Sequence, residues 1–169
     1  MRSALLALFF ALTFVFTVSA FAQADSSTLN LSSTVCTFDD TKQISIRYPE
    51  VPVKADAKLP NDPWTPDHSP IFLFTQTALK IGTSDIPVGA YSLYLQPGKA
   101  DWDLIVSRDV KAGEKYDKSK DLGRANMEIG TLPKATKNFS MYFGHTAPKK
   151  CVLRVDYGAT RAFVDIQEQ

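Results

Sequence analysis

Residues 91–106 read Tyr-Ser-Leu-Tyr-Leu-Gln-Pro-Gly-Lys-Ala-Asp-Trp-Asp-Leu-Ile-Val, and this stretch decides the fold class. Every second residue of 91–95 is apolar, and the same is true of 102–106, where Ile105 adds an apolar residue on the other face. A period of two is typical of a β-strand, because successive side chains point to opposite faces of a sheet. The Pro97-Gly98 pair indicates a turn. The stretch therefore predicts two short strands with turn residues between them.

The same alternation recurs on both sides of this stretch. Further runs with a period of two are found at 44–48, 139–143, 151–155 and 162–166. No long segment has the 3.6-residue period of a helix, and only residues 111–123 are suited to a turn or short surface helix. We therefore predict an all-β fold, an antiparallel β-sandwich of about seven to nine strands with at most one short helix. A jelly-roll-like arrangement is one form of this architecture.

The first 24 residues have the pattern of a secretory signal peptide. Arg2 precedes an apolar run over residues 4–18, and Ala22 and Ala24 supply the small residues of a cleavage site. The alternative is an uncleaved membrane anchor, but the run is short for a bilayer core of roughly 30 Å. We therefore expect cleavage after Ala24, export to the periplasm or the extracellular space, and no stable membrane insertion afterwards.

Cleavage would leave 145 residues, a length that suits one domain. The polar residues 25–33 are expected to form a flexible N-terminal arm, and residues 34–169 the single β-sandwich domain. Arg2 is the only charged residue of the leader, so the remaining chain has 18 basic and 18 acidic residues. This balance gives no strong field that would attract nucleic acid, so no nucleic-acid partner is expected.

The chain has two cysteines, Cys36 and Cys151. In an oxidising compartment a lone pair of cysteines is more often a disulfide than two free thiols. The alternative, a redox-active or metal-binding pair, lacks a C-x-x-C spacing and a neighbouring histidine. We therefore predict a structural disulfide with its Cα atoms about 4.4–6.8 Å apart.

Six of the ten prolines fall within residues 49–70. Proline fixes φ and donates no ladder hydrogen bond, so this segment is predicted to be a long connection. Connections of this length are often functional. Trp64, Asp67 and His68 lie in it and are the candidate ligand-binding residues, with Tyr94 as a further exposed aromatic. The competing interpretation is that Trp64 covers one open end of the core.

No catalytic motif is present. The chain has no nucleophile elbow, phosphate-binding loop or dinucleotide fingerprint, and its two histidines, His68 and His145, are 77 residues apart. We therefore predict no catalytic residue, no metal site and no cofactor. The leading hypothesis is a non-catalytic exported binding or interaction module for an unidentified small molecule, glycan or protein. The alternative is a hydrolase or metal-assisted enzyme whose pocket gathers His68, Asp67 and His145.

Several blocks of the sequence, read in order, resemble the family known as domain of unknown function 2911, found mostly in exported bacterial proteins. These blocks are Phe38-Asp39-Asp40, Ile44-Ser45-Ile46-Arg47-Tyr48, Ile81-Gly82, Ile86-Pro87-Val88-Gly89-Ala90-Tyr91-Ser92-Leu93, Trp102, Tyr116-Asp117, Asp121-Leu122 and Tyr157-Gly158-Ala159-Thr160-Arg161-Ala162. The resemblance implies a compact all-β domain and brings no established activity.

The chain departs from this family's pattern in one place. Family members commonly have a Trp-Arg-x-Gly-Ala-Asn segment between the first strands. Here the corresponding residues are Pro63-Trp64-Thr65-Pro66-Asp67-His68, so Thr65 stands at the position of the arginine. Any role of that arginine in relatives does not carry over to this chain.

Overall fold

The computed structural model describes residues 30–110 and 115–169, which form antiparallel strands and two single-turn 3-10 helices. The strands are β1 (Leu31–Thr37), β2 (Gln43–Pro49), β3 (Ile71–Thr75), β4 (Leu79–Ile81), β5 (Ser84–Ile86), β6 (Gly89–Pro97), β7 (Trp102–Ser107), β8 (Asp121–Thr131), β9 (Ser140–Ala147), β10 (Lys150–Tyr157) and β11 (Thr160–Glu168). The 3-10 turns are η1 (Pro66–His68) and η2 (Lys118–Lys120). Within this part of the chain, no helix is long and apolar enough to cross a membrane. The predicted all-β class is confirmed; the predicted signal peptide lies outside the described residues.

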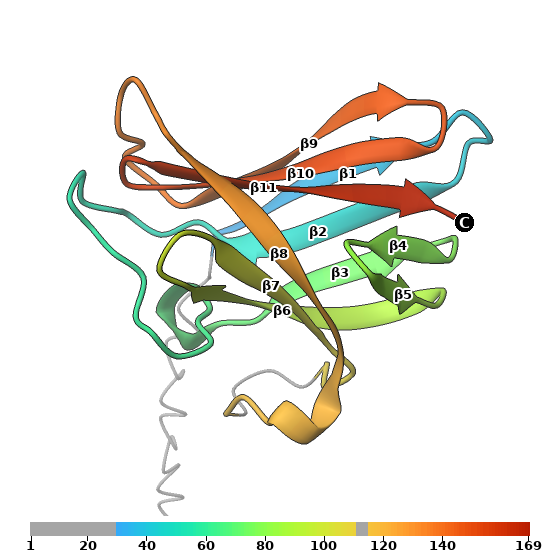
Figure 1. The fold of residues 1–169 in the computed structure, drawn as a ribbon, viewed down its shortest axis with the longest axis horizontal. Helices are drawn as coiled ribbons and strands as arrows, with labels where there is room; N and C mark the ends of the chain where they lie inside the picture. Colours follow the sequence, from blue (N-terminus) through green and yellow to red (C-terminus); the bar gives the residue numbers. More distant parts are fainter. Residues whose placement is uncertain (1–29, 111–114) are drawn as a thin grey trace, which may run out of the picture.

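The strands form one antiparallel sheet in the order β1-β2-β3-β6-β7-β8-β11-β10-β9, with the short β4–β5 pair attached to β11. The sheet curls until it is nearly closed, and β8 crosses diagonally from one half to the other (Figure 1). Where β1 meets β9, the Phe143 backbone N–H donates to Thr34 Oγ1 at 3.0 Å. This is the sandwich-like architecture that the alternation predicted.

The predicted number of seven to nine strands was too low, since the described residues contain eleven. β4 and β5 have three residues each, too few to show a period. A turn or short helix was expected over residues 111–123, of which 111–114 lie outside the described residues. The remainder contains the single turn η2 and the first residues of β8. β1 begins at Leu31 and pairs with β2, so residues 31–33 are a strand, although they were expected to belong to the arm.

Alternate residues of the strands meet in one core. Ile44, Ile46, Leu93 and Leu104 are fully buried, as their period of two predicts. Ile105 on the opposite face of β7 is buried as well, which agrees with the apolar character of both faces of this strand.

A disulfide joins Cys36 of β1 to Cys151 of β10. Their Cα atoms are 6.5 Å apart, so both the predicted bond and the predicted separation are confirmed. Both cysteines are buried in the core. The bond therefore joins β1 to β10, which is the strand that pairs with β9, and it lies close to the place where β1 meets β9.

Residues 50–70 connect β2 to β3 without a strand of their own, as the prolines predict. Short bridges attach this connection to the sheet. The Trp64 N–H donates to the Leu95 carbonyl at 2.8 Å, and the Leu95 N–H donates back at 3.0 Å. Further along the connection, the Gln96 side chain donates from Nε2 to the Asn61 carbonyl at 3.3 Å. The connection is therefore held against β6.

Gly158 begins the two-residue turn between β10 and β11 and supports a testable prediction. Its φ is +59°, and an added Cβ would lie 3.1 Å from the Lys54 carbonyl and 3.2 Å from that of Ala55. An L-residue is disfavoured at this φ by roughly 1–2 kcal/mol. We expect Gly158→Ala to lower the free energy of unfolding by about 2 kcal/mol in urea titration. Gly130→Ala is the matched control, because no atom lies within 4 Å of its added Cβ. A smaller loss for Gly158→Ala than for the control would contradict the prediction.

Candidate functional site

Trp64 is held in place by its backbone and by two rings of the core. Besides the bridge to Leu95, its ring meets Phe139 edge to face at 5.5 Å between centroids and Tyr157 at 5.3 Å. The side chain is only partly buried. Trp64 was expected either to bind a ligand or to cover one open end of the core. Neither interpretation alone describes it, since the ring both packs against the core and lines a cavity.

The η1 turn places the next two candidate residues. Asp67 and His68 have φ values of 49° and 55°, a left-handed conformation that is uncommon for residues other than glycine. Backbone of this kind costs of order 1–3 kcal/mol and is frequent at ligand-binding segments. Pro66, the first residue of this turn, is buried, and the Ser69 N–H donates to its carbonyl at 2.8 Å. The turn is thereby anchored, with Asp67 and His68 exposed on it.

A cavity of about 520 Å³, called the aromatic pocket below, opens beside Trp64. Its lining residues come from the 50–70 connection, from β6 and from the segment before η2. They are Pro60, Asp62, Pro63, Trp64, Thr65, His68, Tyr94, Lys115 and Tyr116. Of the three candidate residues, Trp64 and His68 line this pocket, whereas Asp67 does not.

Tyr94 and Tyr116 form an aromatic pair in this lining. Their rings meet edge to face with centroids 5.1 Å apart. The Tyr116 hydroxyl donates to Asp121 Oδ2 at 2.7 Å and accepts from the Arg124 guanidinium. Burial raises the pKa of Tyr116 to about 12, with the hydrogen bond to Asp121 adding to the effect. The phenol therefore stays neutral and its ring is fixed in place.

Arg124 connects Tyr116, on one wall of the aromatic pocket, to the 50–70 connection, on the other wall. It donates from Nε to Asp121 at 3.0 Å and from Nη1 to Gln96 Oε1 at 2.8 Å. Because Gln96 in turn donates to the Asn61 carbonyl, one hydrogen-bonded series runs from Tyr116 to the 50–70 connection. Both walls of the aromatic pocket are thus held in a fixed relation.

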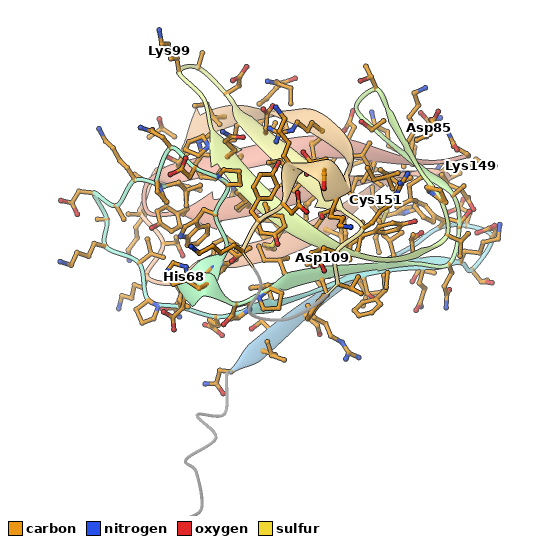
Figure 2. The ribbon with its side chains drawn as sticks, turned by 90° about the horizontal axis from the view of Figure 1, so that it is seen from below. His68, Asp85, Lys99, Asp109, Lys149 and Cys151 are labelled. Atoms are coloured by element: carbon orange, nitrogen blue, oxygen red, sulfur yellow. A yellow bond between two sulfur atoms is a disulfide. The ribbon has the colours of Figure 1, made fainter. Side chains whose placement is uncertain are left out.

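The second histidine lies elsewhere. His145 Nε2 is 3.5 Å from Asp39 Oδ1, and His145 pairs with Cys151 at the start of β10. Trp64 contacts Tyr157 at the end of β10, about 20 Å away at roughly 3.3 Å per residue. Lys149 lies in the turn between β9, the strand of His145, and β10. Figure 2 shows His68 and Lys149 at opposite ends of the molecule. Among the described residues, the structure does not bring His145 to the aromatic pocket.

Metal-ligating side chains are not gathered in this part of the molecule. Across residues 30–110 and 115–169, no group of three or more histidine, cysteine, aspartate or glutamate side chains is placed to hold an ion. Within the aromatic pocket, His68 and Asp62 are the lining side chains of types that commonly bind metals.

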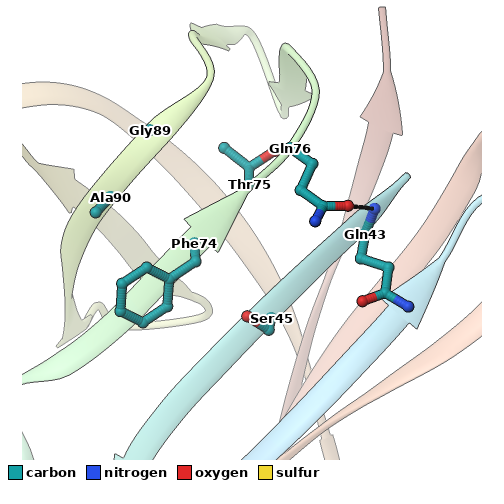
Figure 3. Close-up of a pocket in the computed structure, with 7 residues that line it drawn as sticks. All are labelled: Gln43, Ser45, Phe74, Thr75, Gln76, Gly89 and Ala90. Carbon is teal, nitrogen blue, oxygen red and sulfur yellow. Dashed lines mark hydrogen bonds between the residues drawn. The ribbon is translucent and has the colours of Figure 1, made fainter.

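A second hollow lies on the outer face of β2, β3 and β6 (Figure 3). Its volume is about 300 Å³, and Phe74, 38% exposed, is the aromatic residue of its lining. The Gln43 backbone N–H donates to Gln76 Oε1 at 2.9 Å across one edge. No charged side chain of the described residues lines this hollow, so it has fewer groups for orienting a ligand than the aromatic pocket.

Tyr116, Lys115 and Asp62 line the aromatic pocket but were not among the sequence candidates. Tyr116 lies in a polar segment without periodicity, so no pattern marked it as part of a site. Tyr94 was named only as an exposed aromatic, because its position on the outer face of a predicted strand could be read from the alternation.

Comparison with known proteins adds one match. The model of the family described as "Protein of unknown function (DUF2911)" matches residues 64–166. The matched range starts at Trp64 and includes the Tyr94–Tyr116 pair and the Arg124 network. No curated protein and no solved structure matches this chain.

Proposed function

The chain belongs to the DUF2911 family of proteins of unknown function, and we propose that it is an exported, non-catalytic binding module whose small-molecule ligand occupies the aromatic pocket. The observation that carries the proposal is the gathering of Trp64, Tyr94 and Tyr116 around one cavity of about 520 Å³. Ligand sites of proteins are typically concave, of about 300–1,000 Å³, and lined by aromatic residues with a few polar groups.

The fixed geometry of the pocket supports the same proposal. The Trp64 backbone is bridged to Leu95, and Tyr116 is held by Asp121 and Arg124. A ligand entering such a site does not have to order a loose loop, so more of its contact energy remains as affinity.

Export is supported by two features. The leader of residues 1–24 has the composition of a signal peptide, and the disulfide between Cys36 and Cys151 is of a kind that persists in oxidising compartments. Both features fit a binding protein that meets its ligand in the periplasm or outside the cell.

The proposal is tested by a thermal-shift screen of the purified mature chain against neutral sugars, amino acids, nucleosides and fatty acids. A compound present at ten times its Kd stabilises the native state by about 1.4 kcal/mol and should raise Tm by roughly 4 °C. We expect at least one compound to give such a shift and Tyr94→Ala to abolish it.

The control variant is Phe74→Ala, which removes an exposed ring from the other hollow and should keep the ligand-induced shift. Compounds that stabilise wild type and Tyr94→Ala equally would contradict the proposal, because they would bind outside the aromatic pocket.

A further inference from the structure

We propose that the ligand of the aromatic pocket is a neutral saccharide, whose ring stacks against aromatic side chains while its hydroxyls bond to polar groups of the lining. This inference rests on the proposed function and specifies its ligand class. It follows from how the rings are supported, from the mixture of polar groups and from the balance of charge in the pocket.

The aromatic rings of the pocket form two groups, and each group is held by its own contacts. Trp64 is supported from the core side by Phe139 and Tyr157, and Tyr116 is supported by its contacts with Tyr94 and with Asp121. A pyranose ring has apolar C–H faces that pack well on such side chains, because an aromatic face is negative and a C–H hydrogen is slightly positive. Rigid aromatic side chains also lose little conformational entropy when they bind.

The polar lining groups both donate and accept hydrogen bonds. The Asp62 carboxylate accepts, the Lys115 ammonium donates, and the Thr65 hydroxyl and the His68 imidazole can do either. Sugar hydroxyls likewise donate and accept in alternation around the ring edge. Asp62 and Lys115 are exposed, and neither is in an ion pair with another described residue, so both remain available to a ligand.

The charge of the lining favours a neutral ligand over an ion. Among the described residues, one carboxylate and one ammonium line the aromatic pocket, so the formal charges of Asp62 and Lys115 cancel. Aromatic cages that bind quaternary ammonium groups rely on an electron-rich, cation-free surrounding, and Lys115 opposes this. An anion would in turn be opposed by Asp62. Tyr116 adds no charge, because its hydroxyl donates to Asp121 and its raised pKa keeps it protonated.

The test is a titration of tryptophan fluorescence in the full mature chain. The chain has two tryptophans, and Trp102 is only 6% exposed, so Trp64 is the one placed to respond to a ligand in the aromatic pocket. The probes are cellobiose, maltose and N,N′-diacetylchitobiose, with choline as the cationic and glucuronate as the anionic comparison.

We expect at least one disaccharide to change the emission saturably with a Kd of about 1 mM or tighter, and choline and glucuronate to cause no saturable change. Tyr94→Ala should weaken this binding at least tenfold, whereas Phe74→Ala should leave the Kd unchanged. The mid-point of urea unfolding of each variant, measured in parallel, shows that loss of binding is not loss of folding.

The outcomes separate the ligand class from the proposed function. Saturable binding of choline or glucuronate but of no disaccharide overturns the saccharide inference. If that binding is lost in Tyr94→Ala, the proposed binding function stands. Failure of all three disaccharides while the thermal-shift screen finds a different Tyr94-dependent ligand also overturns the inference alone. Disaccharide binding that survives in Tyr94→Ala overturns it as well, because the sugar would then occupy another site.

Discussion

Replacing both Cys36 and Cys151 with alanine is expected to lower the free energy of unfolding by about 2–5 kcal/mol. The bond closes a loop with a sequence separation of 115 residues, and the simple chain-entropy treatment of such a loop gives about 5 kcal/mol. It also joins β1 to the β10 hairpin near the place where β1 and β9 meet. Without it, the sheet would be free to open at this junction.

Urea unfolding of wild type and of the double variant, each with and without a thiol reductant, measures this effect. Wild type should lose stability when thiol alkylation shows that the bond is reduced, and the double variant should not respond to the reductant. Equal stability of fully reduced and oxidised wild type would show that the bond contributes nothing to the native state.

Trp64→Ala is expected to remove ligand binding and to lower the free energy of unfolding by about 3 kcal/mol. The ring is partly buried and meets Phe139 and Tyr157 edge to face, and pairs of this kind contribute about 0.5–1.5 kcal/mol each beyond their buried area. The backbone bridge to Leu95 survives the substitution, so the connection stays attached to β6.

Two control variants separate packing from exposure. Trp64→Phe keeps an aromatic ring against Phe139 and should lose less than half as much stability as Trp64→Ala. Phe74→Ala removes an exposed ring of similar chemistry and should cost less than about 1 kcal/mol. If Trp64→Ala were as stable as Phe74→Ala, the ring would not be part of the packed structure.

The alternation in residues 91–106 could be interpreted correctly without the structure because it is local. Each residue of a half-buried strand faces either the core or the solvent, so burial is recorded in the order of the residues themselves. β8 is different, because Gly123 interrupts its pattern. An added Cβ at Gly123 would lie 2.4 Å from the Ser84 Cβ, so the glycine is needed for the approach of β5. The glycine is required by the contact with Ser84, 39 positions earlier in the chain, and no local period of the sequence indicates such a contact.

In the candidate site, too, some residues could be identified from the sequence and others only from the structure. The prolines of residues 49–70 identified a stiff connection, and Trp64 and His68 within it line the aromatic pocket. Asp67, next to His68 in sequence, is not among the lining residues, and the order of the residues gave no sign of this difference. Tyr116 could not be assigned to the site from the sequence, since its place there depends on its contact with the Tyr94 ring and on its hydrogen bonds to Asp121 and Arg124.

By itself, the sequence determined the all-β class, the disulfide partners and the long proline-rich connection. These follow from period, from the number of cysteines and from the fixed φ of proline, all of which are properties of single residues or near neighbours. The tertiary structure alone decided that β11 lies between β8 and β10, that His145 is far from His68, and that Trp64, Tyr94 and Tyr116 share one cavity. Such proximities depend on which distant strands pair, and strand pairing is set by the burial of the whole core at once.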